Sequence, residues 1–336
     1  MIYIHIPFCR SFCTYCDFYS ELACKGKDNE NFDSFTGRIL DEIDARRDEM
    51  EKTLGLNTLY IGGGTPSVLP LSLLKKIVGH LGYGPYEEFT VEVNPEDILE
   101  KGPEYASGLL DLGVNRISMG VQSLDDGVLR WMNRRHNAEG AEKAFRILRK
   151  SGFDNISVDV IFGIGGLCNA VLADSIEKIL KWKPEHISAY QLSIEEGSAL
   201  AGLEASGRYT PAEDEHCREQ YDLICSRLSE AGYSHYEISN WALPGREAVH
   251  NSAYWRRIPY AGLGPGAHSL KGRDTRSWNS EELSGWTSDE EHLSEEEIRE
   301  ERLMLGLRTS HGVDGKRIPE SDWFISDSII RDIILS

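Results

Sequence analysis

Apolar stretches of strand length alternate with stretches of helical periodicity along most of the chain. Six apolar runs follow one another at intervals of roughly 30 to 40 residues, over residues 3–8, 57–61, 89–94, 115–122, 156–162 and 186–192. Between them, apolar positions three and four residues apart predict helices over about residues 35–53, 70–81, 105–112, 138–151 and 170–181. The pattern is therefore strand, turn and helix, repeated six times.

This alternation predicts an α/β fold. Alternating strands and helices with largely apolar strands are typical of a parallel sheet covered by helices. Polar residues and glycines stand at or near the ends of the predicted strands, where β/α barrels build their active sites. Six units are fewer than the eight of a closed barrel. We therefore expect a partial (β/α)6 barrel over residues 1–205, with one open side.

The remaining part, residues 206–336, has a different pattern and is predicted to be a small C-terminal α+β domain that covers the open side. A helix is predicted over about residues 211–231, and one alternating aromatic strand over residues 232–241. A glycine-rich segment over residues 260–269 and a helix over about residues 295–307 follow. The carboxylate-rich stretch over residues 281–301 is predicted to be a solvated face or linker.

Composition narrows the class of protein. With 40% apolar and 27% charged residues among 336, the chain is globular and soluble rather than disordered. Its net charge of −19 argues against binding nucleic acid or anionic lipid through bulk electrostatics. Seven cysteines, an odd number, without a secretory signal or a long apolar run predict a cytoplasmic protein whose thiols stay reduced.

Three cysteines near the start of the chain carry the strongest chemical signal: Cys9, Cys13 and Cys16, at the spacing C-x3-C-x2-C. They follow the first predicted strand, which Pro7 ends because proline cannot donate to a ladder. They are therefore expected on a loop that can turn three thiolates toward one point. Iron–sulfur clusters are usually held by four thiolates. With three, a 4Fe–4S cluster keeps one iron free to bind another molecule.

Two other interpretations of these cysteines stay open. One is a disulfide with a spare thiol. The other is a zinc site, which wants four ligands, and for which only His5 or Cys24 is near enough to be the fourth. The further cysteines, Cys24, Cys168, Cys217 and Cys225, are predicted to be packed free thiols.

The cysteine spacing, with Tyr15 directly before the third cysteine, resembles the radical S-adenosylmethionine (SAM) superfamily. The resemblance implies that the open iron of a 4Fe–4S cluster chelates the amino and carboxylate groups of SAM. It also implies that an electron from the cluster cleaves SAM to a 5′-deoxyadenosyl radical. In such chemistry the cofactor carries the reaction, while the protein orients and shields it.

Further motifs follow in order and narrow the resemblance. They are Gly62 to Pro66 (GGGTP), Val91 to Pro95 (VEVNP), Ile117 to Ser123 (ISMGVQS), Asn133-Arg134, Ser157 to Gly163 (SVDVIFG) and Gly262 to Ser269 (GLGPGAHS). Together they resemble the HemN/HemW family of oxygen-independent coproporphyrinogen III dehydrogenases and related haem chaperones.

Several features favour the haem chaperones within this family. The dehydrogenase carries a fourth cysteine two residues beyond the third, where this chain has Phe18, and an extension before the barrel, whereas this chain starts at strand one. The motif His-Asn-x-x-Tyr-Trp, at His250 to Trp255, is typical of the chaperones, in which its histidine is implicated in holding haem. A neutral imidazole is a good ligand for haem iron. The alternative is a packed histidine that caps a turn; His268 is a second haem candidate.

Carried over position by position, the resemblance implies one site of named residues. The cluster ligands are Cys9, Cys13 and Cys16. Tyr3 and Tyr15 are expected to pack beside SAM, and Gly63, Gly64 and Thr65 to line its methionine and ribose through the backbone. Hydrogen bonds are expected from Glu92, Gln122, Arg134 and Asp159, and haem binding from His250. Glu92 and Asp159 suit ribose hydroxyls or a cationic amine or sulfonium, and Arg134 suits a carboxylate; its neighbour Arg135 is the alternative.

The resemblance also implies partners. These are haem-accepting proteins such as respiratory cytochromes, met peripherally at the membrane, and a flavodoxin or ferredoxin as electron donor if SAM is cleaved. The apolar end, residues 333–336, indicates either a curtailed terminal domain or a surface that pairs with another chain, as in a homodimer. The competing functions are oxidative decarboxylation of coproporphyrinogen III by the same radical, or radical chemistry on an unrelated substrate.

Overall fold

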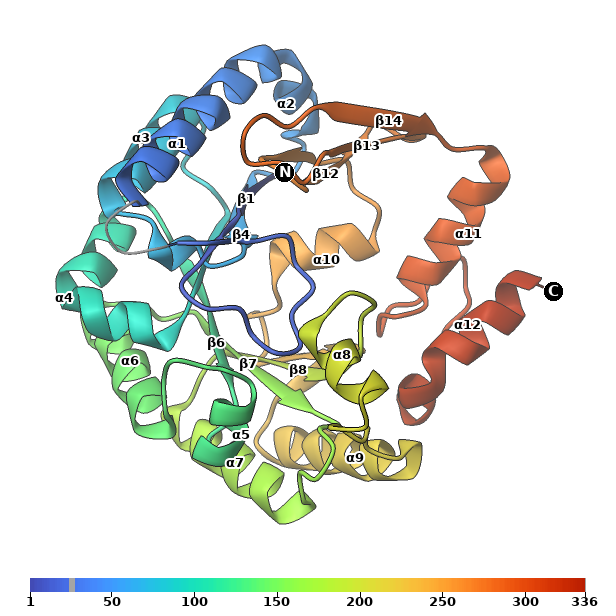
Figure 1. Cartoon of the computed structure of the whole chain (residues 1–336). Coiled ribbons are helices and arrows are strands. Elements are labelled where there is room, and N and C mark those ends of the chain that lie inside the picture. The colour runs from blue at the N-terminus through green and yellow to red at the C-terminus, as the bar shows by residue number, and fades with distance from the viewer. Residues whose placement is uncertain (24–27, 336) are drawn as a thin grey trace.

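The computed structural model describes residues 1–23 and 28–335. Its centre is a run of six parallel strands, each hydrogen-bonded to the next in sequence order (Figure 1). They are β1 (Ile2–Ile6), β4 (Thr58–Gly63), β5 (Glu88–Val93), β6 (Arg116–Gln122), β7 (Ile156–Phe162) and β8 (His186–Gln191). The predicted parallel sheet of six β/α units is therefore confirmed.

Helices cover the outer face of this sheet, as the sequence predicts. They are α1 (Asp28–Ala45), α2 (Arg47–Thr53), α3 (Leu71–Leu81), α4 (Pro95–Asp111), α5 (Asp126–Trp131), α6 (Ala138–Ser151), α7 (Asn169–Trp182) and α9 (Asp214–Glu230). In Figure 1 they form an arc around the strands, from α1 to α9. No helix in the described part of the chain is long and apolar enough to cross a membrane.

The part after residue 205 adds strands to both ends of the central sheet. The full order is β11-β1-β4-β5-β6-β7-β8-β10-β9, where β9 (Ser234–Glu237), β10 (Asn240–Ala242) and β11 (Ala261–Leu263) come from the later part. A separate sheet holds β12 (His268–Lys271), β13 (Thr275–Asn279) and β14 (Ser288–His292). The helices α11 (Glu295–Gly306) and α12 (Ser326–Leu335) follow. The domain boundary at residue 205 stays a prediction.

Several predicted elements differ in the structure. The aromatic strand expected over residues 232–241 is an antiparallel pair, β9 and β10, with a register shift at its turn. The helix expected over residues 35–53 is two helices, α1 and α2. Helix α4 begins ten residues earlier than expected and is broken at Gly102, which has a φ of 70° and precedes Pro103. Glycine tolerates that φ, and proline restarts a helix at its first turn.

The central strands are apolar on one face and polar on the other. In β5, Phe89, Val91 and Val93 are buried in the hydrophobic core, while Glu92 between them faces a cavity. In β6, Ile117 and Met119 alternate in the same way with the cavity-lining Ser118 and Gly120. Since side chains alternate across a strand, the sheet presents an apolar outer face to the helices and a polar inner face.

A short helix, α10 (Val249–Trp255), closes the inner face at the beginning of the strands (Figure 1). The carboxylate of Glu88, the first residue of β5, accepts the backbone N–H groups of Val249 at 2.8 Å and His250 at 2.9 Å. The hydroxyl of Thr58, the first residue of β4, lies 2.8 Å from Nδ1 of His250. The opposite end, where the strands finish, is covered by the loop that carries the cysteines.

Candidate functional site

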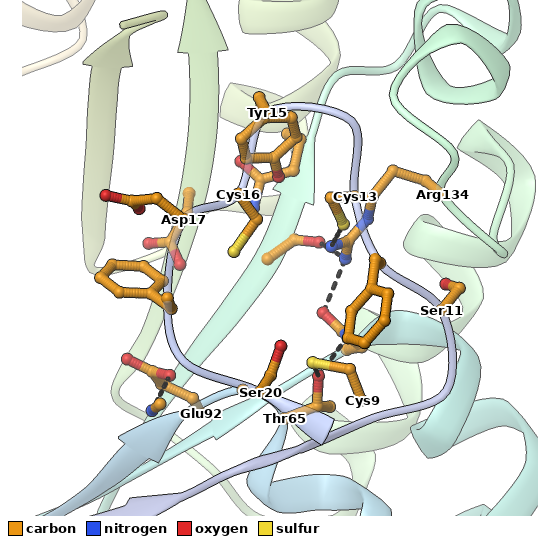
Figure 2. Close-up of a pocket in the computed structure, with 18 of the residues that line it drawn as sticks. Cys9, Ser11, Cys13, Tyr15, Cys16, Asp17, Ser20, Thr65, Glu92 and Arg134 are labelled. Atoms are coloured by element: carbon orange, nitrogen blue, oxygen red, sulfur yellow. Dashed lines mark hydrogen bonds between the residues drawn. The ribbon is translucent and has the colours of Figure 1, made fainter. Parts of the chain in front are cut away.

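A cavity of about 760 Å³ opens at the end of the strands, under the cysteine loop (Figure 2). It is lined by most of the residues that the sequence analysis named for the cluster and SAM. These are Cys9, Cys13, Tyr15, Cys16, Gly63, Gly64, Thr65, Glu92, Gln122, Arg134 and Asp159. This volume lies within the range of about 300–1,000 Å³ that is typical of small-molecule sites. We call it the main cavity.

The cysteine loop is anchored at both of its sides. A two-residue strand that contains Cys9, β2 (Phe8–Cys9), pairs in parallel with β3 (Glu21–Leu22). On the other side, the amide of Asn133 donates to the carbonyl of Phe12 at 2.7 Å, and the hydroxyl of Thr14 donates to the carbonyl of Trp131 at 2.9 Å. The strand and the end of α5 therefore hold the loop open over the cavity.

A continuous chain of polar contacts joins Cys9 to Cys13 across the cavity wall. The Sγ atom of Cys9 lies 3.4 Å from the hydroxyl of Thr65, which accepts from the amide of Asn94 at 3.0 Å. The carbonyl oxygen of the Asn94 side chain accepts from Arg134 at 2.6 Å, and Arg134 in turn donates to Sγ of Cys13 at 3.4 Å. Figure 2 shows Arg134 beside Cys13 and Thr65 beside Cys9. This chain fixes two of the three thiols relative to the strand ends.

The thiols suit an iron–sulfur cluster. Cys9, Cys13 and Cys16 are all free rather than paired in a disulfide. Burial raises the pKa of the Cys16 thiol to about 11, so a metal is needed to hold this group as a thiolate at neutral pH. In the described part of the chain, no three His, Cys, Asp or Glu side chains converge as they would around one zinc ion.

The candidate for a fourth zinc ligand that the structure describes, His5, has both ring nitrogens near other partners. The Nε2 atom of His5 lies 2.9 Å from the carbonyl of Tyr19, and its Nδ1 lies 3.1 Å from the hydroxyl of Tyr3. The other candidate, Cys24, lies outside the described residues. Of the remaining thiols, Cys217 is buried as predicted, whereas Cys168 is exposed, so the prediction that it is packed was wrong.

Gly64 lets the backbone pass close under the cysteine loop. A Cβ atom at this position would lie 2.9 Å from the carbonyl oxygen of Phe8 and 3.1 Å from Sγ of Cys9. Both distances are shorter than ordinary contacts. The preceding Gly63 has a φ of 110°, which side chains rarely adopt. The glycines at the end of β4 therefore allow the segment that carries Cys9 to pass directly over their backbone.

Glu92 is a buried carboxylate that faces the main cavity. Its Oε1 atom accepts from the hydroxyl of Tyr60 at 2.7 Å, and its Oε2 from the backbone N–H of Gly63 at 3.1 Å. Burial, aided by the charge of Asp159, raises the pKa of Glu92 to about 7 despite these two donors. A cationic ligand group would lower this pKa again and stabilise the carboxylate.

Arg134, Asp159 and Gln122 complete the inner wall. Arg134 donates to the carbonyl of Gly120 at 2.7 Å, and its Nε is buried without a partner in the described residues. That donor suits a ligand carboxylate. Asp159 accepts from the hydroxyl of Ser118 at 3.2 Å. Gln122 has a φ of 67°, at a register shift in the pairing of β6 with β7. Such shifts re-aim side chains next to active sites.

Arg135, the alternative to Arg134, is committed elsewhere. Its guanidinium lies 3.5 Å from the carboxylate of Asp97 and 3.7 Å from that of Glu100. Arg135 is exposed at the edge of the cavity, whereas Arg134 reaches the thiol of Cys13.

Tyr3 and His250 do not line the main cavity. Both line a smaller cavity of about 100 Å³, which lies deeper between the strands and α10. We call it the inner cavity. His250 is fully buried; its Nδ1 contacts Thr58 and its Nε2 lies 2.9 Å from the hydroxyl of Tyr254. Burial lowers the pKa of His250 to about 3, so the ring is neutral. In this arrangement neither ring nitrogen is free to bind iron. His268, by contrast, is exposed and stacks on Trp278.

Sequence reasoning missed four residues of the site. Asn94 bridges Thr65 and Arg134, and Tyr60 holds Glu92. Phe12 and Tyr190 line the main cavity with exposed rings, as does Phe18, which the sequence analysis noted only for its position. Large exposed aromatic side chains around a cavity indicate contact with an apolar ligand. The signal for Tyr60 was present, since it alternates with the buried Leu59 and Ile61.

Comparisons with known proteins agree with the geometry. A model of the "Radical SAM superfamily" matches residues 3–179. The "Heme chaperone HemW" of Lactococcus lactis is 35% identical, over 93% of this chain and 82% of its own length. The protein of the same name from Bacillus subtilis is 35% identical over 95% of this chain and 86% of its own.

A solved structure has the same fold. It is described as "Coproporphyrinogen III oxidase (HemN) from Escherichia coli is a Radical SAM enzyme" and superposes with a TM-score of 0.76. The match covers 92% of this chain and 75% of that one, at 20% sequence identity, and so supports the fold alone. The cysteine loop, the cavity and these matches lead to one conclusion: the chain belongs to the radical SAM superfamily and, within it, to the HemW family.

Proposed function

We propose that this protein is a haem chaperone that holds a 4Fe–4S cluster and SAM in its main cavity and binds haem for delivery to other proteins. The observation that carries the proposal is the placement of three free thiols over a cavity of SAM size, in a chain whose relatives are named heme chaperones. The cluster ligands are Cys9, Cys13 and Cys16. When bound, the cluster supplies an electron to SAM.

The side chains of the cavity have distinct parts in this proposal. Arg134 offers its free Nε–H to the carboxylate of SAM, and Tyr15 and the turn at Gly63 to Thr65 pack against the rest of the molecule. Glu92 and Asp159 are acceptors for its ribose hydroxyls or its cationic groups. Tyr3 lies in the inner cavity next to Tyr60, so in this proposal it acts on the SAM site through Tyr60 and does not contact SAM.

Haem binding by His250 requires helix α10 to change its position. The ring is neutral, which is the form that binds iron. However, Nε2 must first leave the hydroxyl of Tyr254, and α10 must move away from the strands. Haem loading is thus proposed to open the end of the sheet opposite to the cysteine loop. The partners we propose are haem-accepting proteins such as respiratory cytochromes, and a flavodoxin or ferredoxin as electron donor.

The test is a haem titration that separates ligation from folding. Haem absorption would be followed in the wild-type protein, in His250→Ala and in a matched control, His136→Ala. His136 is also buried, with both nitrogens engaged, 3.0 Å from the carboxylate of Glu96 and 3.1 Å from the carbonyl of Val121. Its loss should cost similar stability. We expect His250→Ala alone to lose the absorption bands of ligated haem. Equal weakening in both variants, or none, would refute the role of His250.

A further inference from the structure

The inner cavity lies directly beneath the main cavity. Three residues, Tyr60, Ser118 and Tyr190, line both cavities and therefore lie between them. The floor of the inner cavity is α10, through His250 and Tyr254. Its volume is about 100 Å³, less than the roughly 150 Å³ of a cavity that admits benzene. It has room for the end of a flexible chain and no room for a large ring.

One wall of this inner cavity is Arg116, the first residue of β6. Its side chain is only 3% exposed. Within the described part of the chain it makes no hydrogen bond and no ion pair, and its buried Nε has no partner. A guanidinium carries five N–H donors and cannot give up its charge in a protein. Leaving such a group buried and unpaired is costly.

The neighbouring carboxylates balance part of the charge of Arg116 but do not use its donors. Burial lowers the pKa of Arg116, and the charges around it, that of Glu88 first, raise it by more. Both oxygens of Glu88 are taken by the N–H groups at the start of α10. Asp159 accepts from Ser118 instead. The N–H groups of Arg116 are therefore left for a group inside the cavity.

We propose that the inner cavity is a binding site for one carboxylate, held by Arg116. A ligand would extend a short chain into this cavity and place the carboxylate at the end of that chain on the guanidinium. A planar carboxylate matches the guanidinium fork. The charges of Glu88 and Asp159 act on Arg116 from outside the cavity lining, and they repel a singly charged carboxylate less than a doubly charged phosphate. For haem, this carboxylate is a propionate of the tetrapyrrole, and that identification rests on the proposed function.

The first experiment does not depend on haem. Thermal unfolding of the cluster-free protein would be measured with sodium propionate, and with sodium chloride or phosphate at the same ionic strength. The comparison includes Arg116→Gln and a control, Arg256→Gln, which removes an exposed arginine. Propionate at ten times its Kd should raise the melting temperature of the wild type and of Arg256→Gln by about 3 °C. Arg116→Gln should show no such rise.

Three results would overturn the inner site: no saturable rise in the wild type, an equal rise in Arg116→Gln, or an equal rise with chloride. The last would show that any anion, or ionic strength alone, acts on the protein. Arg116→Gln is expected to fold, because the buried Nε of Arg116 has no partner in the described residues and Glu88 keeps its two N–H donors from α10. A cooperative melting transition of this variant without propionate would show that it is folded.

The second experiment compares haem with its dimethyl ester. The wild type should bind haem at least about tenfold more tightly than the ester, since a charge-assisted hydrogen bond is lost. Arg116→Gln should bind both equally. A propionate response without haem binding would keep the inner site and refute the proposed function. Equal binding of haem and ester by the wild type would refute the propionate as the group that Arg116 holds.

Discussion

Replacing Glu92 with Gln should stabilise the protein at neutral pH and leave its stability unchanged in acid. Because burial raises the pKa of Glu92 to about 7, from an ordinary value of about 4.5, the folded protein holds a proton that the unfolded chain has released between these pH values. The stability that this proton contributes is fully present below about pH 4.5 and is lost as the pH rises to about 7.

The magnitude follows from the size of the shift. A rise from 4.5 to about 7 corresponds to about 3 kcal/mol of unfolding free energy. Glutamine keeps the shape and can accept from the N–H of Gly63 while its amide donates to the hydroxyl of Tyr60. The variant should therefore be up to about 3 kcal/mol more stable than the wild type at pH 8, and nearly equal to it at pH 4.5.

The assay is urea unfolding of the cluster-free protein across this pH range. Glu195→Gln is the control, because Glu195 is an exposed carboxylate at the same cavity. It should follow the pH dependence of the wild type. A stability difference between Glu92→Gln and the wild type that stays constant from pH 4.5 to pH 8 would refute the reasoning. SAM binding at pH 7 should also release more protons from the wild type than from Glu92→Gln.

Three further changes test parts of the site. Gly64→Ala should lower the amount of iron that the protein retains after reconstitution, because the added Cβ would lie 3.1 Å from Sγ of Cys9. The control, Gly55→Ala, should retain iron as the wild type does, because its added Cβ would have no atom within 4 Å. Gln122→Gly should raise the unfolding free energy by up to about 1 kcal/mol, since the φ of 67° then costs nothing, yet weaken SAM binding in a titration. Glu88→Gln should lower the unfolding free energy by about 2 kcal/mol, because the N–H groups of α10 lose a charged acceptor; an unchanged urea midpoint would contradict this role.

The order of elements was predictable from the sequence because it depends on local patterns. Each central strand is a short apolar run, and the motif residues stand at or near the ends of those runs. Parallel pairing brings these ends together, so the grouping of the cysteines, the glycines, Glu92 and Arg134 around the main cavity could be predicted. The antiparallel turn between β9 and β10 was missed because Ile238 and Ser239 carry no glycine or proline signal.

The sequence contains a signal for the polar inner face, but the strands were predicted from their overall apolar content, which does not separate the two faces. In β6, Arg116, Ser118 and Gly120 alternate with Ile117 and Met119, a period of two that marks one face of a strand. The position of α10 was beyond local reasoning. It depends on contacts of His250 with Thr58 and Glu88, more than 160 residues earlier in the chain.

The most direct test of the proposed function is anaerobic turnover. The reconstituted protein, shown to hold four irons per chain, would receive reductant, SAM and coproporphyrinogen III, and protoporphyrin would be sought by fluorescence after oxidation. In the same preparation, haem would be titrated by absorption. The haem-chaperone proposal predicts bound haem and no protoporphyrinogen. Many turnovers of coproporphyrinogen would contradict it and would show that a dehydrogenase tolerates Phe18 in place of the fourth cysteine.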